Sequence, residues 1–344
     1  MGGPSYRRTR EGGGFLIYTG DCLAWLTEQE DDSIDLLFGS PPYERARTYG
    51  IDFDLADQAW VDWMVEIVKA AAPKVKGLIA INCQGQTRNY SYSGVPWLLF
   101  VDLKRAGFNM RNPPIFHRVG IPGSGGPDWL RGDYEPIICI TRPGKLPWSD
   151  NTACGHPPKW APGGDMSHRL SDGTKRNQWG ASSKSTGGER GRDGVLKHIK
   201  PKPSHRFHTK REANGEMLTQ GYNVPSLANP GNTIQRNYTA DEVAAMVKHA
   251  SDMVHCKVGG GMMGSPLAHE NEAPFPLELP EFFVLSFCPP GGLVADPWCG
   301  SGTTGHAALL HGRRFIGCDI RQSQVDLTRR RLASVTPLLT EVVS

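Results

Sequence analysis

Residues 296–305 read DPWCGSGTTG, and this stretch decides the fold. An apolar strand is predicted just before it, at 293–295, and a helix just after it. Residues 300–305 match the pattern G-x-G-x-x-G, whose glycines let a nucleotide-like cofactor approach the backbone closely. The next predicted strand, 314–318, leads into Asp319, whose carboxylate can accept hydrogen bonds from both hydroxyls of a ribose. Together these features predict a nucleoside-cofactor site.

The position of the glycine turn and the acid before it indicate which cofactor is bound. The turn comes after most of the predicted sheet, whereas a dinucleotide-binding fold normally has it near the start of its α/β unit. Asp296 precedes the glycines, and its charge would repel a pyrophosphate but favour the cationic methionine end of S-adenosylmethionine (SAM). The stretch therefore favours SAM, and a nicotinamide oxidoreductase is a distant alternative.

A second stretch, residues 34–43, reads IDLLFGSPPY. Its first five residues predict a buried strand that a small-residue turn ends. Pro41 and Pro42 have no backbone N–H, but their carbonyl groups remain acceptors. With the Ser40 hydroxyl and the Tyr43 ring, this turn suits a planar group that carries an NH2 donor, such as the exocyclic amine of a nucleobase. Taken alone, the four residues fit a Pro-rich loop equally well.

Predicted strands and helices alternate before residue 143. The expected strands are 16–18, 77–82, 114–118 and 136–142, and the expected helices are 57–72 and 96–106. Such alternation is typical of a mostly parallel sheet that is covered by helices on both faces. A capping box at 239–242 predicts a helix within the irregular region that follows, and a helix at 279–287 resumes the α/β pattern.

Composition fits a soluble globular protein. The 344 residues are 38% hydrophobic, with a mean hydropathy of -0.40. No apolar run reaches the ~20 residues that span a bilayer, and the polar residues 1–14 predict a flexible tail rather than a secretory signal. The eight cysteines form no C-x-x-C pair, which indicates reduced thiols and a cytoplasmic location. Cys154, His156, His255 and Cys256 lack a standard zinc spacing, so no metal is expected.

Charge is concentrated in one segment. Residues 145–212 contain 14 Lys or Arg and 6 Asp or Glu, a net charge of +8, so the rest of the chain carries −5. The segment also holds five of the eleven histidines and three tryptophans, and it shows no sustained periodicity. These features fit a surface that follows nucleic-acid phosphates and contacts bases. A solvated loop is the alternative.

These motifs resemble those of the amino-methylating DNA methyltransferases, which methylate N4 of cytosine or N6 of adenine. Residues 40–43, SPPY, match the catalytic motif of that family, and residues 296–303 match its SAM motif. Residues 20–22 resemble the segment near the cofactor adenine and ribose, and 275–280 resemble the segment that precedes the SAM motif. The catalytic motif precedes the SAM motif, with a recognition region between them, which is typical of the β group of the family.

The resemblance implies an α/β fold: a circularly permuted, Rossmann-like SAM-dependent methyltransferase sheet with an inserted irregular target-recognition region. The implied parts are a tail at 1–14, a catalytic part at 15–144, a recognition region at 145–265 and a SAM-binding part at 266–344. The implied catalytic residues are Ser40, Pro41, Pro42 and Tyr43. The implied cofactor residues are Asp21, Cys22, Phe275, Asp296, Pro297, Trp298, Gly300, Gly302, Thr303 and Asp319.

The resemblance also implies the reaction, in which a base of double-stranded DNA is flipped out and methylated on its amine. Tyr43 would stack on the base, and Ser40 Oγ and the Pro41 carbonyl would accept its amine hydrogens. The family more often has Asp where this chain has Ser40, and Ser favours cytosine N4 over adenine N6. Trp298 and Cys299 also depart from the usual Phe and small polar residue.

Partners and alternatives follow from the same resemblance. It implies a prokaryotic or phage-encoded protein with no membrane partner, and it allows a cognate restriction endonuclease and a dimer. A methyltransferase that acts on RNA or on another amine is one alternative. A catalytically inactive DNA-binding protein that retains the fold is the alternative from a different class.

Overall fold

The computed structural model describes residues 14–45, 51–118, 132, 134–150, 152–154, 233–234, 266–270 and 274–338. The chain divides into two units, of which one is Met1–Cys154 with Pro230–Ser344 and the other is Gly155–Asn229. All of the described residues belong to the first unit. The helix predicted after the capping box and nearly all of the basic segment lie outside the described residues. The predicted domain boundaries therefore stay a prediction.

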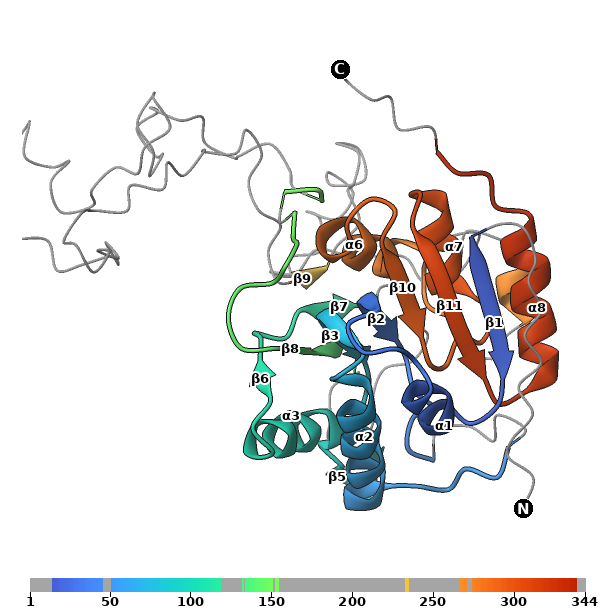
Figure 1. Ribbon diagram of the computed structural model, residues 1–344. Coiled ribbons are helices and arrows are strands. Elements are labelled where there is room, and N and C mark those ends of the chain that lie inside the picture. The colour runs from blue at the N-terminus through green and yellow to red at the C-terminus, as the bar shows by residue number, and fades with distance from the viewer. Residues whose placement is uncertain are drawn as a thin grey trace, which may run out of the picture. The chain divides into compact units, whose positions relative to one another are not determined.

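A nine-stranded sheet runs through the first unit, in the order β1-β11-β10-β2-β3-β8-β7-β9, with β6 paired to β8 (Figure 1). Five neighbouring strands are parallel: β1 (Phe15–Thr19), β11 (Arg314–Asp319), β10 (Leu293–Asp296), β2 (Ile34–Gly39) and β3 (Val75–Asn82). Beyond β3 lie β8 (Tyr134–Thr141), β7 (Ile115–His117), β6 (Asn109–Met110) and β9 (Thr233–Ile234). Of these, β8 is antiparallel to β3.

The two ends of the chain interleave within this sheet. The C-terminal strands β10 and β11 lie between the N-terminal strands β1 and β2. These four strands read as nearly continuous apolar runs, which is typical of strands that are buried on both faces. The interleaving confirms the predicted circularly permuted, Rossmann-like fold.

Helices cover both faces of the sheet (Figure 1). One face carries α1 (Cys22–Thr27), α2 (Asp57–Ala71) and α3 (Val95–Arg105). The other carries α6 (Glu278–Phe287), α7 (Thr303–Leu310) and α8 (Gln322–Ala333). Leu37 packs in the first of these two cores and its neighbour Phe38 in the second, because successive strand residues point to opposite faces.

Smaller elements complete the described part of the chain. A hairpin of β4 (Thr87–Arg88) and β5 (Ser91–Tyr92) follows β3, and η1 (Pro266–Glu270) is a turn of 3-10 helix. No pattern in the sequence predicts either of them. No helix among the described residues is long and apolar enough to cross a bilayer.

The five parallel strands end at one edge of the sheet. Thr19 pairs with Asp319, and Gly39 pairs with Ile81, one residue before Asn82. The segments that follow β1, β11, β10, β2 and β3 therefore emerge side by side. All of the predicted catalytic residues, and most of the predicted cofactor residues, belong to these segments.

Candidate active site

The predicted catalytic turn, residues 40–43, and the glycine turn, residues 296–305, come together although they lie far apart in sequence. Strand β2 pairs directly with β10, with Leu36 opposite Val294. A Cβ atom added to Gly39, which precedes the SPPY turn, would stand 2.5 Å from Asp296 Oδ1 and 3.1 Å from Trp298 Cε3. Real Cβ atoms do not approach other atoms so closely, so a glycine is needed here. The two predicted halves of the site thus form one region.

Asp296 lies at the end of β10 and is 1% exposed. Its carboxylate accepts hydrogen bonds from Thr304 Oγ1 at 2.7 Å and from the Trp298 backbone N–H at 3.0 Å. Burial raises the pKa of Asp296 to about 7, the charge of Asp319 adds to this effect, and the two hydrogen bonds oppose it. Asp296 therefore changes its charge near neutral pH.

The glycine turn is held by its backbone conformation and by Asp319. Gly300 and Gly302 have φ angles of 49° and 77°, in the left-handed region that favours glycine. Gly302 is also the N-cap of α7, and a Cβ atom there would stand 2.8 Å from Thr328 Cγ2. Asp319 Oδ2 accepts a hydrogen bond from the Gly300 N–H at 3.0 Å. The turn is thereby fixed against the end of β11.

A buried arginine of α8 makes hydrogen bonds with the glycine turn. Arg331 is 0% exposed, and its Nη1 donates to Thr303 Oγ1 at 2.8 Å and to the Ser301 carbonyl at 3.2 Å. Its Nε lies 3.2 Å from His306 Nδ1. Burial and, to a smaller extent, the charge of Arg331 lower the pKa of His306 to about 4. His306 is therefore neutral at pH 7 and can accept from Arg331.

Asp21 and Cys22 lie at the neighbouring strand end. Asp21 is exposed, and its Oδ1 accepts a hydrogen bond from the Ala24 N–H at 2.9 Å, which caps α1. The Gly20 N–H donates to the Asp319 carbonyl at 3.1 Å. Burial raises the pKa of the Cys22 thiol to about 12, and the charge of Asp21 adds to this effect. The thiol is thus protonated at neutral pH, as a structural cysteine would be.

Phe275 and Pro297 lie close to the same turns. The Phe275 ring packs edge-on against Phe38, with ring centroids 5.8 Å apart, and Phe38 directly precedes Gly39. Pro297 is buried next to Asp296, and Trp298 is partly buried. The structure therefore groups the predicted cofactor residues around the ends of β1, β11, β10 and β2.

The hydroxyl group of Tyr43 makes hydrogen bonds with three other side chains. It donates to Glu135 Oε2 at 2.7 Å and accepts from Ser40 Oγ at 3.2 Å and from Asn82 Nδ2 at 3.0 Å. Asn82 Nδ2 also donates to Glu135 Oε2, at 2.5 Å. Arg118 Nη1 lies 2.9 Å from the other oxygen of Glu135. The position of the Tyr43 ring is set by these contacts.

The catalytic turn is also fixed from the side of α2. Trp60 Nε1 donates to the Pro42 carbonyl at 2.9 Å, so this carbonyl already has a partner. Glu44, 3% exposed, accepts from the Asp57 N–H at 3.0 Å, from the Gln86 N–H at 3.1 Å and from the Ser93 hydroxyl. These contacts tie the turn to α2 and to the hairpin.

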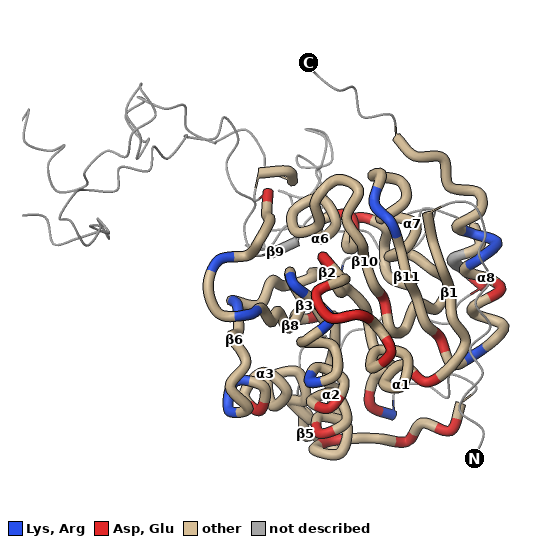
Figure 2. The backbone as a smooth tube through the Cα atoms, viewed as in Figure 1, with Lys and Arg blue, Asp and Glu red and all other residues tan. Residues whose placement is uncertain are grey.

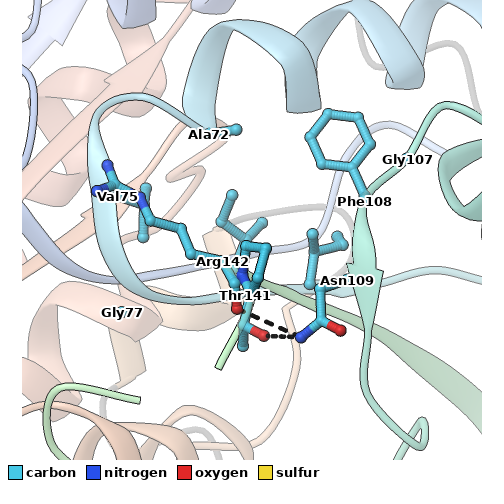
Figure 3. Close-up of a pocket in the computed structure, with 11 residues that line it drawn as sticks. Ala72, Val75, Gly77, Gly107, Phe108, Asn109, Thr141 and Arg142 are labelled. Atoms are coloured by element: carbon cyan, nitrogen blue, oxygen red, sulfur yellow. Dashed lines mark hydrogen bonds between the residues drawn. The ribbon is translucent and has the colours of Figure 1, made fainter. Parts of the chain in front are cut away.

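A cavity of about 210 Å³ lies at the amino end of β3, away from the catalytic turn and the glycine turn. It is lined by Val75, Gly77, Phe108, Thr141 and neighbouring residues, and Asn109 donates to Thr141 Oγ1 beside it (Figure 3). None of the predicted site residues lines it. We therefore place the site at the carboxyl ends of the parallel strands and not in this cavity.

The acceptor groups of the site and its glycine turn fit SAM. Asp21, Asp296 and Asp319 place three carboxylates at one sheet edge, beside a glycine turn that admits a close ligand. Such a set suits a molecule with cationic groups and a ribose diol, and it opposes a pyrophosphate. Within the described ranges, no group of three or more His, Cys, Asp or Glu side chains could hold a metal ion. Of the four residues considered for zinc, only Cys154 is described.

Basic and acidic residues are interspersed over the described part of the chain (Figure 2). The +8 segment that is predicted to contact nucleic acid lies almost wholly outside it. Its role therefore stays a prediction.

Several residues of the site lie outside the motifs that predict it. Asn82 could have been found, because it ends the predicted strand next to the SPPY strand. Glu44 directly follows the motif, but its spacing to α2 gives no signal. Glu135 and Arg331 belong to no motif and are recognised only by their tertiary contacts.

A mixed α/β sheet with five neighbouring parallel strands, and with a glycine turn and strand-end acids at one edge, is the architecture of a class, the SAM-dependent methyltransferases. The comparison with family models is more specific. The model described as DNA methylase, N6_N4_Mtase, matches residues 34–330. The chain therefore belongs to the N4/N6 amino-methylating DNA methyltransferases, with SAM as methyl donor and DNA as substrate, as predicted.

Curated relatives agree over most of their length. The chain is 22% identical to "Type II methyltransferase M.SfiI" of Streptomyces fimbriatus, over 91% of this chain and 90% of the relative. It is 24% identical to "Type II methyltransferase M.PvuII" of Proteus hauseri, over 90% and 81% respectively. It is 23% identical to "DNA adenine methyltransferase YhdJ" of Escherichia coli K12, over 92% and 82%.

Solved structures share the fold. The structure titled "PVUII DNA methyltransferase (cytosine-N4-specific)" superposes with a TM-score of 0.55 at 17% identity, over 96% of this chain and 89% of that chain. A DNA modification methylase of Thermus thermophilus gives 0.50 at 18% identity, over 94% and 96%. At these identities the likeness supports the fold alone.

Proposed function

We propose that this DNA methyltransferase transfers a methyl group from SAM to N4 of a cytosine that is flipped out of a specific duplex sequence. The observation that carries the choice of base is Ser40, which places a hydroxyl where the family more often has a carboxylate. Two features support a direct role for this turn: it touches Asp296 of the SAM motif through Gly39, and its conformation is fixed by buried partners.

Two acceptors of the turn would hold the target amine. The Pro42 carbonyl accepts from Trp60, which leaves Ser40 Oγ and the Pro41 carbonyl for the two amine hydrogens. Such bonds would turn the nitrogen lone pair away from ring conjugation and towards the SAM methyl group. The nitrogen would attack the methyl carbon as the C–S bond breaks, so that the sulfonium sulfur of SAM leaves as a neutral thioether. The methylated amine, which is then cationic, would lose one proton to solvent water. Proximity and alignment supply much of the acceleration.

Tyr43 would stack on the flipped base. Its hydroxyl has three partners, so the ring is already fixed before a base arrives. A fixed stacking surface lowers the ordering cost of the extruded base.

The cofactor would occupy the neighbouring strand ends. Asp296 would face the cationic methionine end of SAM, and Asp319 would accept from its ribose. Phe275 would cover one side of the cofactor. The other proposed contacts are Asp21, Cys22, Pro297, Trp298, Gly300, Gly302 and Thr303.

Names of relatives support both choices of base. The solved relative titled cytosine-N4-specific favours cytosine, and the relative named DNA adenine methyltransferase makes N6 of adenine the second candidate. Two relatives are named type II methyltransferases, which supports a cognate restriction endonuclease as a partner. This partner and a dimer stay predictions.

Contact with duplex DNA is assigned to the basic segment, residues 145–212, within the proposed target-recognition region. Its net charge of +8 and its tryptophans support this assignment. The remaining −5 makes the rest of the chain a poor phosphate-binding surface by comparison.

Nucleoside mass spectrometry of DNA that has been methylated in vitro tests the proposal. We expect N4-methylcytosine. If the product is N6-methyladenine, the target base is adenine and not cytosine. Unmodified DNA, from a protein that still binds DNA, would support the catalytically inactive DNA-binding alternative. An RNA substrate assayed in parallel tests the alternative of an RNA methyltransferase.

A further inference from the structure

We propose that Glu135 is a positioning residue for methyl transfer: through the Tyr43 hydroxyl, it makes Ser40 Oγ a stronger acceptor for the amine that is methylated. This inference rests on the proposed function, in which Ser40 accepts from that amine. It adds a carboxylate from β8, outside both sequence motifs, to the catalytic apparatus.

The directions of the hydrogen bonds support this role. Ser40 Oγ donates to the Tyr43 oxygen at 3.2 Å, and Tyr43 donates to Glu135 Oε2 at 2.7 Å. A hydroxyl has one hydrogen and two lone pairs. The Tyr43 oxygen uses both lone pairs, because Asn82 Nδ2 donates to it at 3.0 Å as well. The single hydrogen of Ser40 is thereby committed to Tyr43, and only its lone pairs face a substrate.

Burial makes this chain of hydrogen bonds effective. Glu135 is 5% exposed and Asn82 is 1% exposed. In a medium of low dielectric constant, hydrogen bonds in a chain polarise one another, by about 10–30% per bond. A chain that ends on a carboxylate is stronger still, because its last bond is charge-assisted. Electron density is therefore drawn towards Ser40 Oγ, which receives the amine hydrogen.

Two further features keep the chain in this arrangement. Arg118 Nη1 lies 2.9 Å from Glu135 Oε1, so each carboxylate oxygen has its own partner and the group cannot rotate freely. Burial, together with the charge of Glu135, raises the pKa of Tyr43 well above its usual value. Tyr43 therefore keeps its proton and acts as the donor. The family more often has Asp at the position of Ser40, and this chain places a carboxylate two hydrogen bonds away from that serine.

A double-mutant cycle tests the proposal. Single-turnover methyl transfer would be measured for the wild type, Glu135→Gln, Tyr43→Phe and the double variant, with SAM and DNA saturating. Gln keeps the shape of Glu without the charge, and Phe keeps the stacking ring. Each single change should slow transfer about 3–10-fold. The double variant should be no slower than the slower single variant, because the carboxylate acts only through the hydroxyl.

Controls separate this role from a structural one. Glu66→Gln, on the exposed face of α2, should leave the rate unchanged. SAM affinity and the urea midpoint would be measured for all four proteins, so that a loss of folding is seen directly. If the double variant is slowed by the product of the two single effects on the transfer rate, the role of Glu135 is wrong. This holds even if urea unfolding shows that the two residues are coupled in stability.

Failure of the proposed function would look different. If the wild type yields no methylated amine, the proposed function is wrong and the role of Glu135 falls with it. If the wild type yields a methylated amine but the losses multiply, only the role of Glu135 is wrong.

Discussion

Gly39 and Asp296 are in contact across two neighbouring strands: a methyl group added to Gly39 would stand 2.5 Å from Asp296 Oδ1. The first of these residues precedes the catalytic turn, and the second begins the SAM motif. The fold thus joins the two halves of the site at a point where a side chain has no room.

Replacing Gly39 with alanine tests this contact. The new methyl group would push on the Asp296 carboxylate and on the Trp298 ring, 3.1 Å away. We expect weaker SAM binding and a loss of stability of about 1–3 kcal/mol, as for other overpacked core positions. Calorimetry with SAM and urea unfolding measure the two effects. Gly132→Ala is the matched control, because its Cβ would meet only Gln84 Nε2, at 3.7 Å.

Tyr43→Ala removes the stacking surface while Asp296 and Asp319 are left intact. We expect most of the turnover to be lost with an unchanged SAM dissociation constant, because stacking on a base is worth about 1–3 kcal/mol. A labelled-methyl transfer assay and calorimetry measure the two quantities. A variant that no longer binds SAM would contradict the stacking role.

Asp296 should make SAM binding depend on pH. Its pKa is raised to about 7, so it is mostly neutral at pH 6 and mostly ionised at pH 8. A cationic ligand favours the ionised form, so SAM should bind on the order of tenfold more weakly at pH 6 than at pH 8. Titrations from about pH 6 to about pH 8 measure this slope. The slope should vanish in Asp296→Asn.

The same carboxyl group should affect stability with the opposite sign. Its folded pKa lies above the unfolded value, so the folded protein binds more protons between pH 4 and 7. Its contribution to stability without SAM is therefore greatest at low pH and is lost as the pH rises through about 7. Urea unfolding of the wild type and of Asp296→Asn across this range measures the difference.

Asp319→Ala should weaken SAM binding about 10–150-fold, which corresponds to a charge-assisted hydrogen bond of about 1.5–3 kcal/mol. Part of the loss would come from the glycine turn, because the Gly300 N–H loses its acceptor. Asp326→Ala on the exposed side of α8, where the carboxylate pairs with Arg329, serves as the control. Equal SAM affinity in wild type and Asp319→Ala would remove Asp319 from the cofactor site.

Binding to DNA should weaken steeply with salt. The +8 segment could neutralise several phosphates, and each one contributes a slope of about −0.9 to log K against log salt. Fluorescence anisotropy with a labelled duplex gives the slope when it is measured from about 50 to about 200 mM salt. A flat dependence would contradict the assignment of this segment.

Local patterns account for what the sequence could predict. The glycine turn and the SPPY turn each lie within ten residues, so the sequence alone predicts the chemistry of each turn. That the two turns lie together, at the ends of β2 and β10, is known only from the structure. The direction of β8 was not visible, because an apolar strand reads alike in either direction. Glu135 and Arg331 were missed for a similar reason: their partners come from other elements and define no spacing along the chain.

The interleaved strand order also constrains how the protein is made. Asp35 of β2 accepts a hydrogen bond from the Leu293 N–H of β10, across 258 positions of the chain. At about 5–20 residues per second, a ribosome needs on the order of tens of seconds to synthesise that interval. Throughout it, one apolar edge of β2 has no strand to pair with, and such edges invite aggregation. A nascent chain that ends before β10 contains every residue of the catalytic turn but lacks the strand that pairs with β2.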